Sequence, residues 1–205
     1  IEEVIAHYGK FYLLLLEKYI KLVESTILRS SGYWDFKLMG VLSPFAKIID
    51  SLICKKIREA LGGDIEYFIL RGPFLDRQTE LFFLSIGIPV LRGFGTVMSS
   101  SLVSLNFKKN DCYTLGSSGK PFHNTCLKIV DPLNKNPLSV GEIGEIYIRS
   151  ESIVTVDLKD SKNPIPKSVE DWYSTKWFGF MDLDGFLFVD GVLHSYMKNS
   201  IGEKF

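Results

Sequence analysis

A strand–helix–strand succession in the first half of the chain places the strongest constraint on the fold. Ile65–Leu70 is a short apolar run typical of a buried strand, and Ile88–Leu91 is a second one. Between them, Asp76 is placed to cap a helix with apolar residues in its second half, and Gly87 is placed to end it. This spacing predicts a parallel crossover unit with a ligand crevice at the carboxyl ends of its strands.

Two helical patterns precede this unit. Apolar residues recur at three- and four-residue spacing from residue 1 to about residue 28, which predicts a helix that packs against the rest of the protein. A helix on a membrane surface is the alternative. After Pro44 a second such pattern runs to Ile57, and Gly62–Gly63 predicts its end, because glycine adopts the left-handed conformation at little cost.

From about residue 101 the sequence changes to short strands separated by turns. Strands are predicted at 101–106, 127–131, 143–149, 178–181 and 186–190, with turns at 131–132, 136–137 and 184–185. Asn163–Pro166 indicates an exposed loop. The fold class is therefore α/β, a partial parallel β-α-β layer over residues 1–100 followed by a mostly β subdomain over residues 101–190.

Composition excludes several classes of protein. The chain has 205 residues, 46% of them hydrophobic, with Lys+Arg and Asp+Glu both at 24, so it is neither disordered nor basic enough for a nucleic-acid partner. Three scattered cysteines argue against a disulfide scaffold and a structural zinc site. The apolar run Phe11–Leu16 is too short to span a bilayer. Because the chain begins with Ile1, we expect the natural start to lie upstream.

Two local motifs could carry chemistry, but a simpler interpretation is favoured for each. Gly116–Pro121 contains a Gly-rich loop with a lysine, yet it lacks P-loop spacing, and a strand pattern follows where a helix should begin. Asp182, Asp184 and Gly185 resemble the start of a calcium loop, but the remaining ligands are missing, so a hairpin turn is the better account. The histidines at 7, 123 and 194 have no ligand or triad spacing.

Gly93-Phe94-Gly95 is the remaining local candidate. It follows a predicted strand, its glycines allow close approach of a ligand, and Phe94 offers a face for stacking. With residues 71–75 it would form the crevice of the crossover unit. The residues alone support an α/β chain with one crevice near 71–75 and 93–98.

A set of ordered segments resembles the AMP-forming acyl-CoA synthetases, and most of all the long-chain fatty acid–CoA ligases. These segments are Lys56–Gly63, Gly87–Gly95, Leu115–Pro121, Lys128–Asp131, Gly141–Ile146 and Asp182–Leu187. The resemblance covers roughly residues 50–205 and implies the C-terminal half of the large domain of an adenylate-forming ligase. It also implies that the family's phosphate loop lies upstream, that residues 191–205 begin the hinge, and that the small C-terminal domain with its catalytic lysine would follow.

The resemblance implies a reaction and its cofactors. Family members use ATP, magnesium and coenzyme A to convert a fatty acid into an acyl-adenylate and then into a thioester. Positions that keep the family's nucleotide-site shape are Gly72, Pro73, Gly93, Phe94 and Gly95. We expect none of the cofactors to bind well here, because other positions of the same site have changed.

Six changed positions carry that expectation. Arg71 stands where the family has a glycine beside adenine, Val97 where it has a threonine, and Met98 where it has the magnesium-binding glutamate. Trp177 replaces the aspartate that holds the ribose, and an indole accepts no hydrogen bond. Gly191 and Val192 replace the hinge aspartate and the phosphate-facing arginine.

These retained and changed positions together predict a pseudoenzyme, which keeps the fold of the family but has no catalytic residue and no metal site. Two alternatives stay open: a non-catalytic binding or partner-docking module, and one piece of a split ligase completed by another polypeptide. A fatty acid or nucleotide would be a partner only where residual binding survives. A cytoplasmic location, or one at a membrane surface, is expected.

Overall fold

The computed structural model describes residues 14–25, 44–72, 75–99, 102–107, 113–151, 153 and 172–192. The chain divides into two compact units. The first comprises Ile1–Leu70, Leu75–Leu91 and Lys109–Gly116, and the second comprises Arg71–Phe74, Arg92–Lys108 and Ser117–Phe205. The predicted loop at 163–166 and His7, Pro73 and His194 lie outside the described residues.

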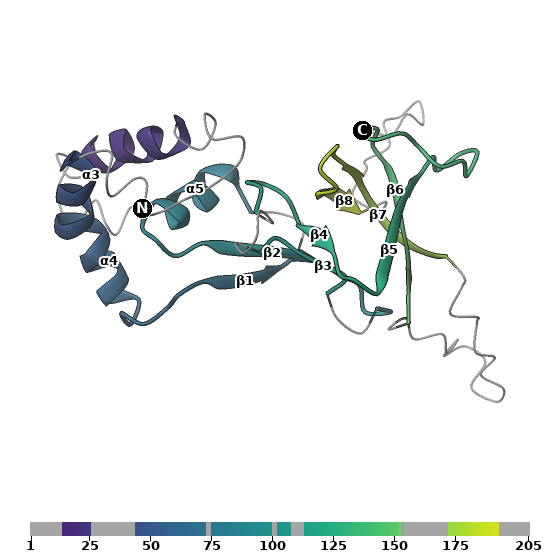
Figure 1. The fold of residues 1–205 in the computed structure, drawn as a ribbon, viewed down its shortest axis with the longest axis horizontal. Coiled ribbons are helices and arrows are strands. Elements are labelled where there is room, and N and C mark those ends of the chain that lie inside the picture. The colour runs from purple at the N-terminus through teal and green to yellow at the C-terminus, as the bar shows by residue number, and fades with distance from the viewer. Residues whose placement is uncertain are drawn as a thin grey trace, which may run out of the picture. The chain divides into compact units, whose positions relative to one another are not determined.

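The helices of the first unit agree with the two predicted patterns. A helix covers residues 14–25, and its buried side chains are Leu16, Tyr19 and Val23, which share one face because they are three and four residues apart. The second pattern forms one helical run, α3 (Pro44–Ile49), the π-helical segment η1 (Asp50–Cys54) and α4 (Lys55–Ala60) (Figure 1). The π-helical turn inside this run was not predicted.

The end of α4 and the cap of α5 are where the sequence predicts them. The amide of Gly63 donates to the carbonyl of Arg58 at 2.8 Å, and the positive φ of Gly62 and Gly63 ends the helix. α5 (Arg77–Ser85) begins after Asp76, whose carboxylate accepts a hydrogen bond from the amide of Thr79 at 3.1 Å. Both predictions are confirmed.

The first sheet has the strand order β1-β2-β3-β4. β1 (Phe68–Arg71) begins three residues later than predicted, and its residues alternate between half-buried and exposed. The prediction of a buried strand at 65–70 was therefore wrong, because β1 lies at the edge of the sheet and only one of its faces is covered. α5 packs on β1 through an edge-on contact between Phe83 and Phe68, with ring centroids 5.5 Å apart. β2 (Val90–Phe94), next to it, is buried throughout.

In the second unit, the end of β2 pairs antiparallel with β3 (Ser104–Leu105), which pairs antiparallel with β4 (Lys120–Pro121). The Gly-rich segment before β4 therefore leads into a strand and not into a helix, which confirms the interpretation against a P-loop. Its backbone is already paired, since the amide of Ser118 donates to the carbonyl of Leu187 and the amide of Leu187 donates to the carbonyl of Gly119.

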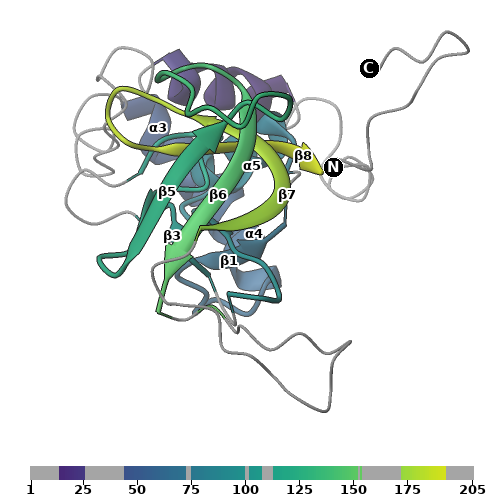
Figure 2. The same cartoon turned by 90° about the vertical axis from the view of Figure 1, so that its right-hand side faces the viewer.

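The second sheet is an antiparallel meander of β5 (Thr125–Val130), β6 (Gly144–Ser150), β7 (Tyr173–Met181) and β8 (Leu187–Val192) (Figure 2). All four strands were predicted, but β7 begins five residues earlier and β8 ends two residues later. The predicted hairpin turn is confirmed, because the carboxylate of Asp182 accepts from the amides of Asp184 and Phe186.

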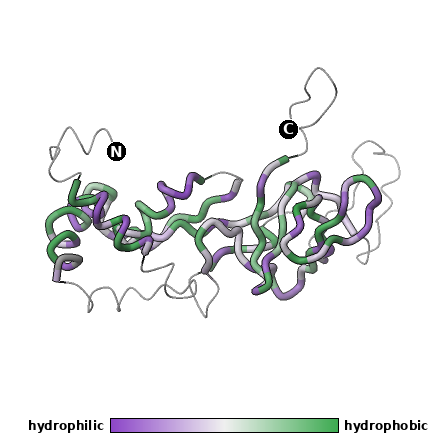
Figure 3. The backbone as a smooth tube through the Cα atoms, turned by 90° about the horizontal axis from the view of Figure 1, so that it is seen from above, coloured by the Kyte–Doolittle hydropathy of each residue, from purple (hydrophilic) through white to green (hydrophobic). Residues whose placement is uncertain are grey.

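The core of the second unit consists of buried apolar side chains from both of its sheets, namely Phe94, Val103, Ile129, Ile146, Ile148, Leu187 and Val189. Hydrophobic stretches run through both units along the backbone (Figure 3). Among the described residues, none of the helices has the length and apolar content needed to cross a membrane.

Candidate functional site

A cavity of about 410 Å³ opens in the second unit beside the end of β2. It is lined by Arg71, Gly72, Gly93, Phe94, Gly95, Thr96, Val97, Thr175 and Trp177. The crevice predicted from residues 71–75 and 93–98 lies here. Thr175 and Trp177 come from β7, far along the chain, and complete the wall.

The end of β2 forms one wall of the cavity. A side chain at Gly93 would meet the side chain of Leu102 at 2.9 Å and the carbonyl of Ser104 at 3.0 Å, so the close pairing of β2 with β3 requires glycine there. Phe94 is only 5% exposed and belongs to the core cluster. Its ring meets the indole of Trp177 edge to face, with centroids 5.9 Å apart and an interplanar angle of 76°.

A tight turn after β2 forms the rim. Three hydrogen bonds join Thr96 and Ser99. The amide of Thr96 donates to the Ser99 hydroxyl at 2.9 Å, the amide of Ser99 donates to the Thr96 hydroxyl at 3.3 Å, and the Ser99 hydroxyl donates to the carbonyl of Thr96 at 2.9 Å. The turn presents Val97, which is 86% exposed, while Met98 is half-buried and does not line the cavity. The rim therefore offers an apolar tip where the resemblance implies a hydroxyl and a carboxylate.

This donor set does not fit magnesium. A hard cation needs oxygen ligands, and Val97 and Met98 supply a hydrocarbon and a thioether. Within the part of the chain that the structure describes, no group of three His, Cys, Asp or Glu side chains could hold a metal ion.

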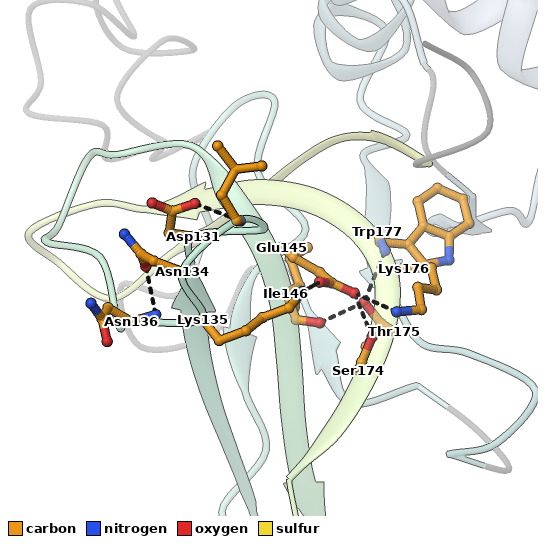
Figure 4. Close-up of polar contacts among 11 residues, drawn as sticks. Asp131, Asn134, Lys135, Asn136, Glu145, Ile146, Ser174, Thr175, Lys176 and Trp177 are labelled. Carbon is orange, nitrogen blue, oxygen red and sulfur yellow. Dashed lines mark hydrogen bonds and ion pairs between the residues drawn. The ribbon is translucent and has the colours of Figure 1, made fainter. Parts of the chain in front are cut away.

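A bulge in β7 places Thr175 and Trp177 at the cavity. Between Glu145 and Tyr147 of β6, the facing residue changes from Phe178 to Ser174, so the segment 175–177 faces Ile146 alone. The hydroxyl of Thr175 donates to the carbonyl of Ile146 at 2.7 Å and accepts from the amide of Trp177 at 3.1 Å (Figure 4). The hydroxyl of Thr175 thus provides hydrogen-bond partners for two backbone groups at the bulge, so its role here is structural.

The carboxylate of Glu145 lies beneath this bulge. Glu145 is 3% exposed at its side chain and lies 3.3 Å from the ammonium of Lys176 and 3.2 Å from that of Lys135 (Figure 4). The hydroxyl of Ser174 also donates to it. Burial raises the pKa of Glu145, but the hydrogen bonds from Ser174, Lys135 and Lys176 outweigh burial and hold the pKa below its usual range.

The structure brings most of the sequence-predicted positions together. All of the following line this cavity: Arg71, Gly72, Gly93, Phe94, Gly95, Val97 and Trp177. Gly191 and Val192 belong to β8, where they face Phe178 and Trp177. Sequence reasoning missed Glu145 and the bulge. The available signal was Thr175-Lys176-Trp177, which stands where the resemblance implies Thr-Gly-Asp, so that a lysine occupies a position suited to glycine.

Comparisons with known proteins give a match to one family model and to several curated relatives. The family model described as "AMP-binding enzyme" matches residues 36–156. The chloroplastic long-chain-fatty-acid–[acyl-carrier-protein] ligase AEE15 of Arabidopsis thaliana is 32% identical over 121 residues, 59% of this chain and 16% of that protein. Fatty acyl-CoA synthetase B of Dictyostelium discoideum is 27% identical over 181 residues, 84% of this chain and 27% of that protein. The chain thus spans about a quarter or less of the length of these relatives.

Solved structures share the fold. The anthranilate CoA ligase AuaEII, in complex with anthranoyl-AMP, matches with a TM-score of 0.54 at 22% identity, over 68% of this chain and 26% of that one. The ATP-bound RpMatB-BxBclM chimera B3 matches with a TM-score of 0.61 at 17% identity, over 78% of this chain and 31% of that one.

Proposed function

The chain belongs to the family of AMP-binding enzymes, and from that premise we propose that it keeps the scaffold of a long-chain fatty acid–CoA ligase without activating a fatty acid. In this proposal the cavity beside Phe94 corresponds to the nucleotide site of an active ligase. Its shape is retained, but the groups that would hold ribose and magnesium are replaced. The chain is then a pseudoenzyme with respect to acyl-adenylate formation.

The position of Trp177 is the observation that carries this proposal. Its indole lines the cavity edge-on to Phe94, at the sequence position where the resemblance implies the ribose-binding aspartate. An indole donates one hydrogen bond and accepts none, so both ribose hydroxyls lose their acceptor. Losing two hydrogen bonds to a charged group costs on the order of 3–6 kcal/mol of binding free energy.

The rim supports the same conclusion for the phosphates. Adenylation of a carboxylate needs positive charge on the polyphosphate, which a divalent cation ordinarily supplies. Val97 and Met98 place no oxygen ligand on the rim turn. Arg71 also lines the cavity and contributes a cation, but a guanidinium does not replace a metal on the phosphates.

A variant that restores a hydrogen-bond acceptor at position 177 tests the proposal directly. We expect the wild-type chain to bind adenosine with a Kd above about 1 mM, that is, with less than about 4 kcal/mol of binding free energy. Trp177→Asp should improve the affinity by at least tenfold, because it supplies the missing carboxylate and opens the space of the indole. Isothermal titration calorimetry measures both.

Trp177→Phe is the matched control, because it reduces the ring without adding an acceptor, and it should leave the affinity near that of the wild type. A second assay uses palmitate, ATP, magnesium and labelled pyrophosphate with the wild-type chain, where we expect no exchange above the blank. Tight adenosine binding by the wild type, or clear pyrophosphate exchange, would overturn the proposal.

A further inference from the structure

We infer that Glu145 is a positioning residue for Trp177. Its carboxylate holds Lys176 in the left-handed backbone conformation, and that conformation directs the indole into the wall of the cavity. The inference goes beyond the proposed function, because the position of Trp177 is a property of the folded chain whether or not the cavity binds a ligand.

Glu145 is linked to Trp177 through Lys176, the residue before it in the bulge. Lys176 lies between Thr175 and Trp177, and its φ is 63°, a conformation that residues with a Cβ rarely adopt. In an ordinary strand, successive side chains point to opposite faces of the sheet. The bulge adds two residues to β7 opposite β6, so Trp177 stays on the face of Tyr173 and Thr175, and the left-handed residue within the bulge sets the path of the backbone into the side chain that follows it. Trp177 is that side chain.

Glu145 contacts the bulge through two residues of β7. Its Oε1 atom accepts from the hydroxyl of Ser174 and lies 3.3 Å from Nζ of Lys176 (Figure 4). These partners precede and follow Thr175, so one carboxylate fixes both sides of the turn that Thr175 satisfies internally. The glutamate is buried on β6, while Lys176 is 56% exposed at its side chain. We therefore take Glu145 as the rigid partner of this ion pair, which restrains the more exposed Lys176.

A second left-handed lysine supports the same role. Among the residues that the structure describes, the non-glycine residues with positive φ are Lys135 and Lys176, at 62° and 63°. Both ammonium groups pair with Glu145, one at each carboxylate oxygen. Backbone strain persists only where its surroundings fix it. The amide of Lys135 also donates to the carbonyl of Asp131 at 3.0 Å, so Lys135 has a turn of its own, and Glu145 is the partner that the two left-handed lysines share.

Fluorine NMR on the chain labelled with 5-fluorotryptophan tests this inference. The chain contains three tryptophans, Trp34, Trp172 and Trp177, and Trp177→Phe assigns the resonance of interest. In Glu145→Gln we expect the Trp177 resonance to move from its wild-type position, since an uncharged amide no longer attracts the ammonium of Lys176. Glu151→Gln, at an exposed residue just beyond β6, should leave that resonance in place.

The double variant Glu145→Gln/Lys176→Gly separates positioning from a general loss of structure. Glycine adopts a positive φ without help, so this variant should return the resonance toward its wild-type position. A folded Glu145→Gln variant with an unmoved resonance, or a double variant that shows no recovery, would overturn the inference.

If Glu145→Gln does not fold, two single variants at Lys176 test whether its left-handed backbone positions Trp177. Lys176→Gly should keep the wild-type Trp177 resonance, while Lys176→Ala should move it, because alanine lacks both the ammonium and the tolerance of a positive φ. Equal spectra for the glycine and alanine variants would contradict the role of the left-handed backbone.

Discussion

The turn before β4 and the lining of the cavity both contain a glycine with positive φ, but their surroundings differ. A Cβ at Gly119 would lie 1.9 Å from the carbonyl carbon of Leu105, whereas a Cβ at Gly72 would meet nothing within 4 Å. The first glycine is fixed by packing between backbone segments. The second faces the open cavity and is constrained only by its own backbone.

The same difference extends to the neighbouring strands and rim. In the second sheet, a Cβ at Gly144 or Gly179 would lie 2.6 Å or 2.2 Å from a carbonyl oxygen of the adjoining strand. In the lining of the cavity, by contrast, Arg71 and Val97 are exposed. Packing therefore predicts that these sheet glycines cannot be replaced, whereas the exposed side chains at 71 and 97 can change without unfolding the protein.

Alanine substitution of two nearby glycines should give the largest effect. Gly119→Ala forces a Cβ into the backbone of β3, and we expect it to destabilise folding by more than about 4 kcal/mol. Gly116→Ala has a similar positive φ but open space at the Cβ, so strain alone should cost about 1–2 kcal/mol. Urea unfolding followed by circular dichroism measures both. Similar midpoints for the two variants would show that packing does not distinguish these positions.

Acid should weaken the second sheet through Glu145. Because the folded-state pKa of Glu145 lies below its unfolded value, its contribution is present above the unfolded pKa of about 4.3 and is lost as the pH falls through the folded pKa. We expect Glu145→Gln to cost about 2 kcal/mol at pH 7 and progressively less toward pH 2, since hydrogen bonds to a charged group are worth about 1.5–3 kcal/mol each.

Urea unfolding of the wild type and of Glu145→Gln at a series of pH values measures this difference. The two stability curves should converge at low pH. Curves that stay parallel from pH 7 to pH 2 would show that the carboxylate contributes nothing through its charge. Glu151→Gln, in which an exposed carboxylate changes, should follow the wild-type curve.

Local signals in the sequence predicted much of the fold. The cap at Asp76 and the turn at Asp182 were predicted because a short polar side chain bonds backbone amides only two to four residues away. The strand–helix–strand unit predicted the place of the cavity, since ligands bind at the carboxyl ends of such strands. These features depend on residues close together in the chain.

Features set by distant pairing were missed. Nothing in Ile65–Leu70 indicates that β1 is an edge strand, because burial of a strand depends on its neighbours in the sheet. The start of β7 was missed because the polar residues at 174–176 interrupt its apolar pattern. The contact of Glu145 with Ser174 joins residues 29 positions apart, and its partners follow only from the strand register.

The rim itself should show the smallest effect. Val97 is 86% exposed at the tip of the turn, so Val97→Thr should change the free energy of unfolding by less than about 0.5 kcal/mol. Val103→Thr makes the same chemical change in the core, where the side chain is 1% exposed, and should cost about 1–3 kcal/mol, because the new hydroxyl is buried. Thermal unfolding measures both variants. A loss above about 1 kcal/mol at Val97 would show that packing constrains the rim as it constrains the core, and the contrast between the two regions would then fail.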